Sequence, residues 1–246
     1  MNNGTKSYIV NYINRLKTNK VFTANTFANE SISVGAARMV LERMVSEGKI
    51  RKFDKGRYYK PEQSMFGEIA PSVEDVIIDL IESKTTHQPI GYLTGTIAFN
   101  LLGLTTQVSS QIQIGVRKYR RRLKRGQYTI SFIHQPNAIT RENIGLLRLL
   151  DALRFFREIP ATAPNDVVVR MIFLIGKLDL EQQQRMIGLA LHYSPYVRAL
   201  LGAILEHIGV GKEQTKPLRH SLNALTHYKL LISQENLPTL SNWNIR

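Results

Sequence analysis

The chain has 246 residues, of which 43% are hydrophobic, no cysteine, and a formal net charge of +14. The lack of cysteine excludes disulfides, thiolate zinc sites and cysteine nucleophiles. No segment has a signal-peptide pattern or reaches the roughly 18 uncharged apolar residues of a membrane span, so we expect a cytoplasmic protein with no membrane partner.

Positive charge is concentrated in two segments. Residues 1–60 carry twelve basic and four acidic side chains, and residues 117–125 carry seven basic side chains. The rest of the chain is therefore close to neutral. Two basic segments on a neutral body indicate a surface that binds a polyanion, with nucleic acid as the first candidate. The alternatives are a solvated surface and an acidic protein or membrane partner.

The first sixty residues predict three helices. Apolar residues at helical spacing predict a helix over 5–16, and Thr23 is suited to cap a short second helix. Ser33 is a natural N-cap for the third helix, and Gly48 is a natural stop after it. The inward stripe of the third helix is expected to consist of Val34, Ala37, Leu41, Met44 and Val45.

The third helix and the segment after it predict a winged helix-turn-helix that binds DNA. A recognition helix needs small residues where its backbone enters the major groove and a long donor nearby, and Gly35, Ala36 and Arg38 meet this need. A basic hairpin with its turn at Gly56 follows, and such a wing lies along phosphates. The expected DNA-binding residues are Thr23, Ser33, Gly35, Ala36, Arg38, Arg43, Arg51, Lys52, Lys55 and Arg57.

Interpretations in which the same residues do not contact DNA stay open. A winged helix can serve protein contacts instead of DNA. Arg43 can simply pair with Glu47 one helical turn away. One of Tyr58 and Tyr59 is expected in the core rather than on DNA.

The remainder of the chain predicts a mixed segment followed by a mainly helical one. The passage 61–72 has two prolines and a glycine, which is typical of a linker. Residues 167–178 fit either a buried strand or a buried helix. The other expected elements are helices over 73–83 and 95–103 (the latter capped by Thr94), strands over 105–116 and 126–133, and helices over 142–156, 179–193, 195–209 and 217–231. The fold class is thus α+β, with a winged helix-turn-helix domain over 1–62 and a C-terminal α+β domain of antitoxin type over 63–246.

The second basic segment is a further candidate for binding nucleic acid. It could clamp DNA backbone or hold RNA, and Tyr119 within it offers a stacking face. The alternative is a solvated loop, or a patch that meets acidic residues elsewhere in the chain. Its basic members are Arg117, Lys118, Arg120, Arg121, Arg122, Lys124 and Arg125.

Signals for an enzyme are poor. The six histidines lack metal-ligand spacing, and the segment 209–212 lacks the full spacing of a phosphate-binding loop. We therefore expect no catalytic residues, no metal and no cofactor.

Three passages resemble the AbiEi-type antitoxins of abortive-infection, type IV toxin–antitoxin systems. They are AARMVLERMVSEGKIRKFDKGRYYKP, GYLTGTIAFNLLGLTTQV and YSPYVRALLGAILEHIG, and their order follows the layout of that family. The resemblance implies a transcriptional autorepressor that binds inverted repeats in its operator. It also implies a functional partner, a nucleotidyltransferase-like toxin, that the antitoxin counteracts without a stable complex.

We therefore expect a DNA-binding autorepressor and antitoxin that is able to self-associate on DNA. The alternatives are a protein-interaction adaptor and a nucleic-acid-processing protein that uses a winged helix for targeting.

Overall fold

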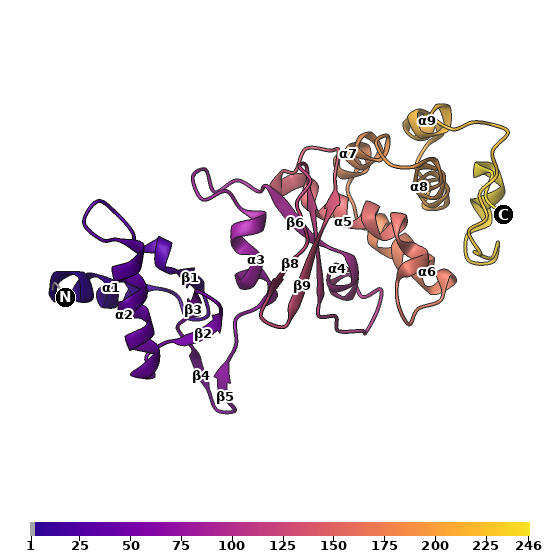
Figure 1. Ribbon diagram of the computed structural model, residues 1–246. Coiled ribbons are helices and arrows are strands. Elements are labelled where there is room, and N and C mark those ends of the chain that lie inside the picture. The colour runs from indigo at the N-terminus through magenta and orange to yellow at the C-terminus, as the bar shows by residue number, and fades with distance from the viewer. Residues whose placement is uncertain (1–2) are drawn as a thin grey trace. The chain divides into compact units, whose positions relative to one another are not determined.

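A three-stranded antiparallel sheet and two helices build the N-terminal part of the computed structural model, which describes residues 3–246 (Figure 1). The first of two compact units extends to residue 80 and also includes residues 124–127; the second comprises residues 81–123 and 128–246. The first unit thus extends beyond the predicted boundary at residue 62. The reason is that Glu62 and Glu68 lie in a hairpin whose side chains bond to Asn19 and Arg51.

The first unit contains three helices, one 3-10 turn and five short strands among its described residues. Its elements are α1 (Asn3–Arg15), β1 (Val21–Thr23), the 3-10 turn η1 (Ala24–Thr26), α2 (Val34–Ser46), β2 (Arg51–Asp54), β3 (Arg57–Tyr59), β4 (Glu62–Ser64), β5 (Gly67–Ile69) and most of α3 (Val73–Ile81). Strand order in the sheet is β1-β3-β2, and β4 and β5 form a separate hairpin. The predicted linker over 61–72 is therefore partly a hairpin, and the predicted second helix is only the three-residue η1.

The core of the first unit lies between α1, α2 and the sheet. Ile9 and Ile13 of α1 are buried, and the rings of Phe22 and Phe27 meet edge to face at 5.7 Å. The predicted inward stripe of α2 is confirmed at Ala37, Leu41 and Met44 but is wrong at Val34, which is 38% exposed because the first turn of α2 lies at the surface. Val40 is buried in its stead.

The second unit combines a small sheet with a set of helices. Its elements are β6 (Gly91–Thr94), α4 (Gly95–Leu101), β7 (Gln111–Val116), β8 (Leu123–Arg125, shared with the first unit), β9 (Tyr128–His134), α5 (Arg141–Arg154), η2 (Phe156–Glu158), α6 (Pro164–Gly176), α7 (Leu180–Ala190), α8 (Pro195–His207), α9 (Lys212–His220) and η3 (Pro238–Trp243). The strand order is β6-β7-β9-β8. Since β7 is antiparallel to β6 and parallel to β9, the ends of β7 and β9 share one sheet edge with the beginning of β6.

The structure confirms the predicted α+β class and corrects several elements of the second unit. Residues 167–178, which fitted a strand or a helix, lie mostly in α6, and β7 begins only at Gln111. The helix predicted over 217–231 is wrong beyond His220. The backbone of Tyr228 bonds instead to Asn244 and Arg246, so this segment pairs with the C-terminus.

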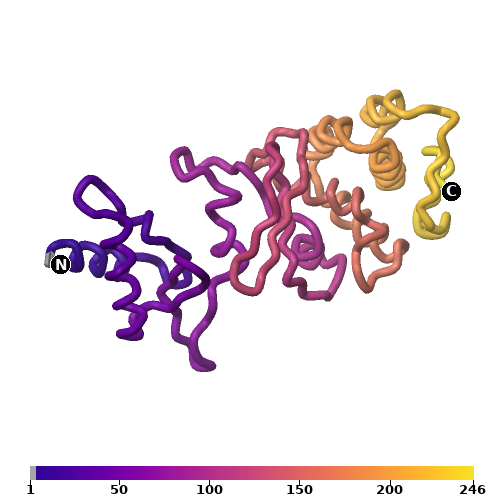
Figure 2. Tube along the Cα trace, viewed as in Figure 1, coloured from indigo at the N-terminus to yellow at the C-terminus, as the bar shows by residue number. Residues whose placement is uncertain are grey.

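The end of the chain is anchored on α8. Figure 2 shows the last residues running alongside that helix, where η3 packs. The ring of Trp243 lies where a Cβ on Gly202 would be, at 2.3 Å from its nearest ring carbon, so only glycine allows this approach. The indole N–H donates to Glu206 Oε2 at 2.7 Å, which fixes the ring in place.

A buried polar network connects the sheet of the second unit to its helices. Asp151 of α5 accepts hydrogen bonds from Tyr92 (2.6 Å) and Thr94 (2.8 Å) on β6 and from Tyr193 (3.0 Å) after α7. Gln135 donates to both tyrosine hydroxyls, at 2.8 and 2.7 Å. Each tyrosine therefore accepts from Gln135 and donates to Asp151, which gives the network one direction. The hydroxyl of Thr94, predicted to cap α4, donates to Asp151 instead.

We predict that the ionisation of Asp151 destabilises the fold. Burial raises the pKa of Asp151, while its hydroxyl donors oppose the shift. A raised pKa means that the folded state keeps a proton that the unfolded chain loses above about pH 4, so this contribution to stability is lost as pH rises through the raised pKa. The free energy of unfolding of the wild type, minus that of Asp151→Asn, should fall as pH rises above about 4.5 in urea titrations.

The exposed aspartate Asp166 provides the control, since Asp166→Asn should show no such trend. If the wild-type free energy of unfolding minus that of Asp151→Asn instead rose with pH, the prediction would be contradicted. The three hydroxyl donors would then lower the pKa of Asp151 by more than burial raises it.

Candidate nucleic-acid interface

The first turn of α2 presents a capped, small-residue surface. Ser33 Oγ accepts from the Ala36 N–H at 3.2 Å, so the predicted N-cap is confirmed. Gly35 and Arg38 are exposed beside it, and Met39 is 61% exposed. Among residues 3–246 Arg38 has no hydrogen-bond partner. Its guanidinium is therefore available to a ligand at this end of the helix.

The hairpin of β2 and β3 follows α2 closely. Gly48 ends the helix with a φ of +72°, and Gly56 turns the hairpin with a φ of +71°, as predicted for both. Asp54 Oδ1 accepts the Lys55 N–H at 2.6 Å, which fixes the turn. Lys55 is exposed at the tip and, in the described part of the chain, its ammonium group has no ion pair.

Most other cations of the predicted interface are paired with carboxylates. Arg51 Nε lies 2.9 Å from Glu68, and Lys52 Nζ lies 3.2 Å from Glu42. Arg43 pairs with Glu47 at 3.2 Å, which confirms the pairing given as the alternative to a DNA contact. The pairs of Lys52 and Arg43 are exposed and contribute at most about 1 kcal/mol each, so a phosphate can replace those carboxylates at little cost. Arg51 is half-buried and bonds to Glu68 through two nitrogens.

Glu42 connects the helix to the hairpin. The hydroxyl of Tyr58, which is buried, donates to Glu42 Oε1 at 2.7 Å, and this hydrogen bond is the main reason why the pKa of Glu42 is lowered. Burial raises the pKa of Tyr58 to about 12. Tyr58 is thus the core member of the tyrosine pair, while Tyr59 is half-buried.

Four of the predicted DNA-binding residues lie in the sheet, Arg51 and Lys52 on β2 and the other two on neighbouring strands. Thr23 on β1 stands opposite Arg57 on β3, and both are half-buried. Burial and the neighbouring Arg125 lower the pKa of Arg57, against the attraction of Asp79 and Asp54. Arg57 is therefore part of a mixed-charge cluster within the first unit rather than a freely exposed wing residue.

Arg125 does not belong to an exposed basic patch, and this part of the prediction is wrong. The residue is only 3% exposed, and its guanidinium donates to the Val76 carbonyl and to both carboxylate oxygens of Asp79. Arg125 is the last residue of β8, and its buried guanidinium is hydrogen-bonded to a carboxylate and a carbonyl. Its role is structural.

The rest of the second basic segment lies at the surface, as predicted. Arg117, Lys118, Arg121, Arg122 and Lys124 are exposed. Arg120 is half-buried, with its guanidinium over the ring of Phe132 at 5.7 Å. The side chain of Tyr119 is 83% exposed.

A groove of about 450 Å³ lies beside this segment in the second unit. Cationic residues Arg117, Lys118 and Arg120 line it, together with apolar residues that include Ile90 and Ile139. Sequence patterns gave no sign of the groove, because its residues come from three separate segments that meet only through strand pairing.

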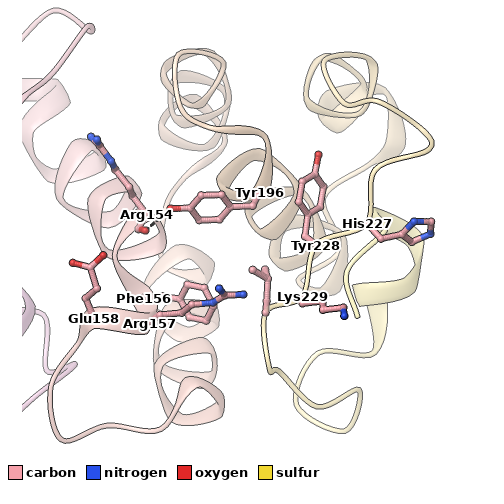
Figure 3. Close-up of a pocket in the computed structure, with 9 residues that line it drawn as sticks. Arg154, Phe156, Arg157, Glu158, Tyr196, His227, Tyr228 and Lys229 are labelled. Carbon is pink, nitrogen blue, oxygen red and sulfur yellow. Dashed lines mark hydrogen bonds between the residues drawn. The ribbon is translucent and has the colours of Figure 1, made fainter.

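A larger groove of about 590 Å³ lies near the C-terminus of the second unit (Figure 3). Tyr196 Oη donates to the Arg154 carbonyl at 2.5 Å, and the Arg157 guanidinium lies 5.8 Å from the ring centre of Phe156. Figure 3 shows that guanidinium directed toward the segment of Tyr228. The groove thus offers aromatic faces and one guanidinium, which is a surface for binding rather than a constellation for acid–base chemistry.

Residues 3–246 contain no group of three or more side chains suited to hold a metal ion. Within the same range, no helix has the length and apolar character that crossing a membrane requires. His87 lies beside Glu82, with 2.7 Å between Nδ1 and Oε1.

The chain belongs to the DUF6088 family, a family of unknown function whose model matches residues 8–156. No match was found among curated proteins. Among solved structures, the chain is similar to the RV2827C protein from Mycobacterium tuberculosis, with a TM-score of 0.47 and 13% sequence identity. That similarity covers 92% of this chain and 85% of the other.

We predict that Arg125 and Arg121, four residues apart, differ sharply in their contribution to stability. Arg125→Ala removes the buried partner of Asp79 and one donor to the Val76 carbonyl, and should lower the free energy of unfolding by about 1–3 kcal/mol. The exposed Arg121→Ala should change it by less than about 0.5 kcal/mol. Urea denaturation measures both. An Arg125→Ala variant of unchanged stability that binds DNA with a lower salt dependence would restore the phosphate-binding role.

Proposed function

We propose that the chain is a DNA-binding transcriptional autorepressor and that its first unit acts as a winged helix-turn-helix. The observation that carries the proposal is the capped, small-residue first turn of α2, with Arg38 unpaired beside it and the basic hairpin tip at Lys55 following in the same unit. A helix of this kind fits the major groove end-on, and a hairpin of this kind fits the phosphate backbone.

The order of elements supports this assignment. A helix, a short strand, a single turn of helix, a longer helix and a two-stranded hairpin follow one another, and the first strand pairs with the hairpin. This is the order expected of a winged helix, with η1 in the place of the second helix. One such unit reads only a few base pairs, so we propose that two copies self-associate on an operator of inverted repeats.

The antitoxin role rests on the resemblance to the AbiEi-type antitoxins. In this proposal the second unit counteracts a nucleotidyltransferase-like toxin without forming a stable complex with it. The chain itself is proposed to have no enzymatic activity and no cofactor, and to act in the cytoplasm.

One observation favours the adaptor alternative. Arg43, Arg51 and Lys52 are all paired with carboxylates, which reduces the net charge that the first unit presents to DNA. A surface of alternating cations and carboxylates also suits a protein partner of mixed charge.

We predict that Arg38 and Lys55 affect DNA binding in different ways. Lys55→Ala should weaken binding on all sequences and reduce the salt slope by about 1, because it removes one phosphate contact. Arg38→Ala should cost about 1–3 kcal/mol on the preferred site and relax the site preference. Fluorescence anisotropy on the DNA upstream of the gene, over a series of salt concentrations, measures both effects.

Arg15→Ala removes an exposed cation of α1 in the same unit and is the matched control. If all three variants bound DNA as the wild type does, the adaptor alternative would replace the DNA-binding proposal.

We further predict that repression and antitoxicity are separable. An Arg38→Ala/Lys55→Ala double variant should lose repression of a reporter placed behind the chain's own upstream DNA. It should still restore the growth of cells that express the proposed nucleotidyltransferase-like toxin, because the second unit is unchanged. Loss of growth rescue together with repression, in a double variant that stays folded and abundant, would contradict separate roles for the two units.

A further inference from the structure

One edge of the sheet in the second unit gathers three chain segments. Val116 at the end of β7 pairs with His134 at the end of β9 and with Gly91 at the beginning of β6. Loops that leave the carboxyl ends of parallel strands are the common place for ligands in sheets of this kind, since their polar groups are not used in pairing. The groove of about 450 Å³ lies at this edge, and its volume is within the usual range of ligand pockets, roughly 300–1,000 Å³.

The charged residues that line this groove are all cations. Residues 83–141 contain nine lysines and arginines and not a single aspartate or glutamate. Every residue that lines the groove comes from this stretch, including the cations Arg117, Lys118 and Arg120. On the first unit most cations are paired with carboxylates, whereas Arg117 and Lys118 are exposed and make no ion pair within residues 3–246. The ligand that complements this edge is therefore an anion.

The same edge also presents apolar and aromatic surface. Ile90, Val116 and Ile139 line the groove opposite the cations, and Ile90 is 37% exposed. Tyr119 stands between Lys118 and Arg120 with 83% of its side chain exposed, although the fold gains nothing from an exposed ring. A ligand that uses the whole edge therefore carries planar or apolar faces as well as negative charges.

We propose that this groove, with Tyr119 at its border, binds a single-stranded polynucleotide. A duplex offers its phosphates to the cations but keeps its base faces stacked inside, where neither Tyr119 nor the apolar wall reaches them. A single strand offers both, with phosphates beside Arg117 and Lys118 and an unstacked base against the Tyr119 ring. An acidic peptide offers charge alone. This site lies in the second unit and goes beyond the proposed operator binding.

The test uses the full chain and fluorescence anisotropy with a labelled 12-nucleotide single strand, as RNA and as DNA of the same sequence, and with the corresponding duplex. Tyr119→Ala should weaken single-strand binding about ten-fold, because stacking contributes roughly 1–3 kcal/mol per base. It should leave duplex binding unchanged, and Tyr119→Phe should bind as the wild type does. The RNA and DNA arms show which sugar the site accepts.

Arg117→Gln/Lys118→Gln should weaken single-strand binding and reduce its salt slope by about 0.7 for each phosphate that the variant no longer neutralises. The control is Lys177→Gln/Lys216→Gln, which removes the same charge from exposed positions outside the groove and should bind as the wild type does. Arg38→Ala/Lys55→Ala should also keep single-strand binding, so a failure of operator binding and a failure of this site are told apart.

Two results would overturn the proposal. One is that Tyr119→Ala and Arg117→Gln/Lys118→Gln, with unchanged circular dichroism, bind the single strand as tightly as the control does. The other is that a poly-glutamate peptide displaces the strand from the wild type while Tyr119→Ala has no effect, since the edge would then recognise charge alone.

Discussion

The carboxylate of Asp151 is the constraint around which the second unit is arranged. Burying an ionisable group is costly, and here three hydroxyls, two on β6 and one after α7, reduce that cost. Because Gln135 donates to two of those hydroxyls, it fixes the direction of their protons as well as their positions. Asn137 in turn donates to the Gln135 carbonyl at 3.0 Å. The network thus holds β6, the segment after β9, and the helices α5 and α7 in one arrangement.

That arrangement places the basic loop at the sheet edge. Gln135 and Asn137 immediately follow β9, so the network fixes the chain where β9 ends, and the pairing of β7 with β9 brings Arg117 to the same edge. The cations of this loop repel one another, and such a cluster is tolerated because it is solvated and screened. Arg125, the buried member of the run, has a carboxylate partner, Asp79. One basic segment of the sequence therefore contains a structural residue, Arg125, and a set of cations that lie at the surface.

Local features were predictable from the sequence, and non-local ones were not. The cap at Ser33 and the turns at Gly48 and Gly56 depend on a few adjacent residues, and all three were confirmed. The hairpin β4–β5 escaped prediction because its residues are all exposed and show no alternation of apolar and polar side chains. The parallel pairing of β7 with β9, the Asp151 network and the groove at the sheet edge join residues more than ten positions apart. Charge counting located both basic segments but could not tell which cations have carboxylate partners.

The two candidate surfaces differ in a way that bears on what each can bind. On the first unit, several cations are paired with Glu42, Glu47 and Glu68, so a phosphate that binds at one of these cations displaces a carboxylate that stays nearby. Repulsion from these carboxylates weakens the binding of an anion whose charges do not match the positions of the cations. A ligand whose phosphates match those positions binds more tightly. On the second unit the charged residues that line the groove are cations, and Arg117 and Lys118 make no ion pair within residues 3–246, so affinity there depends less on the spacing of its charges. The first surface is therefore suited to discriminate among rigid ligands, and the second to hold a flexible one.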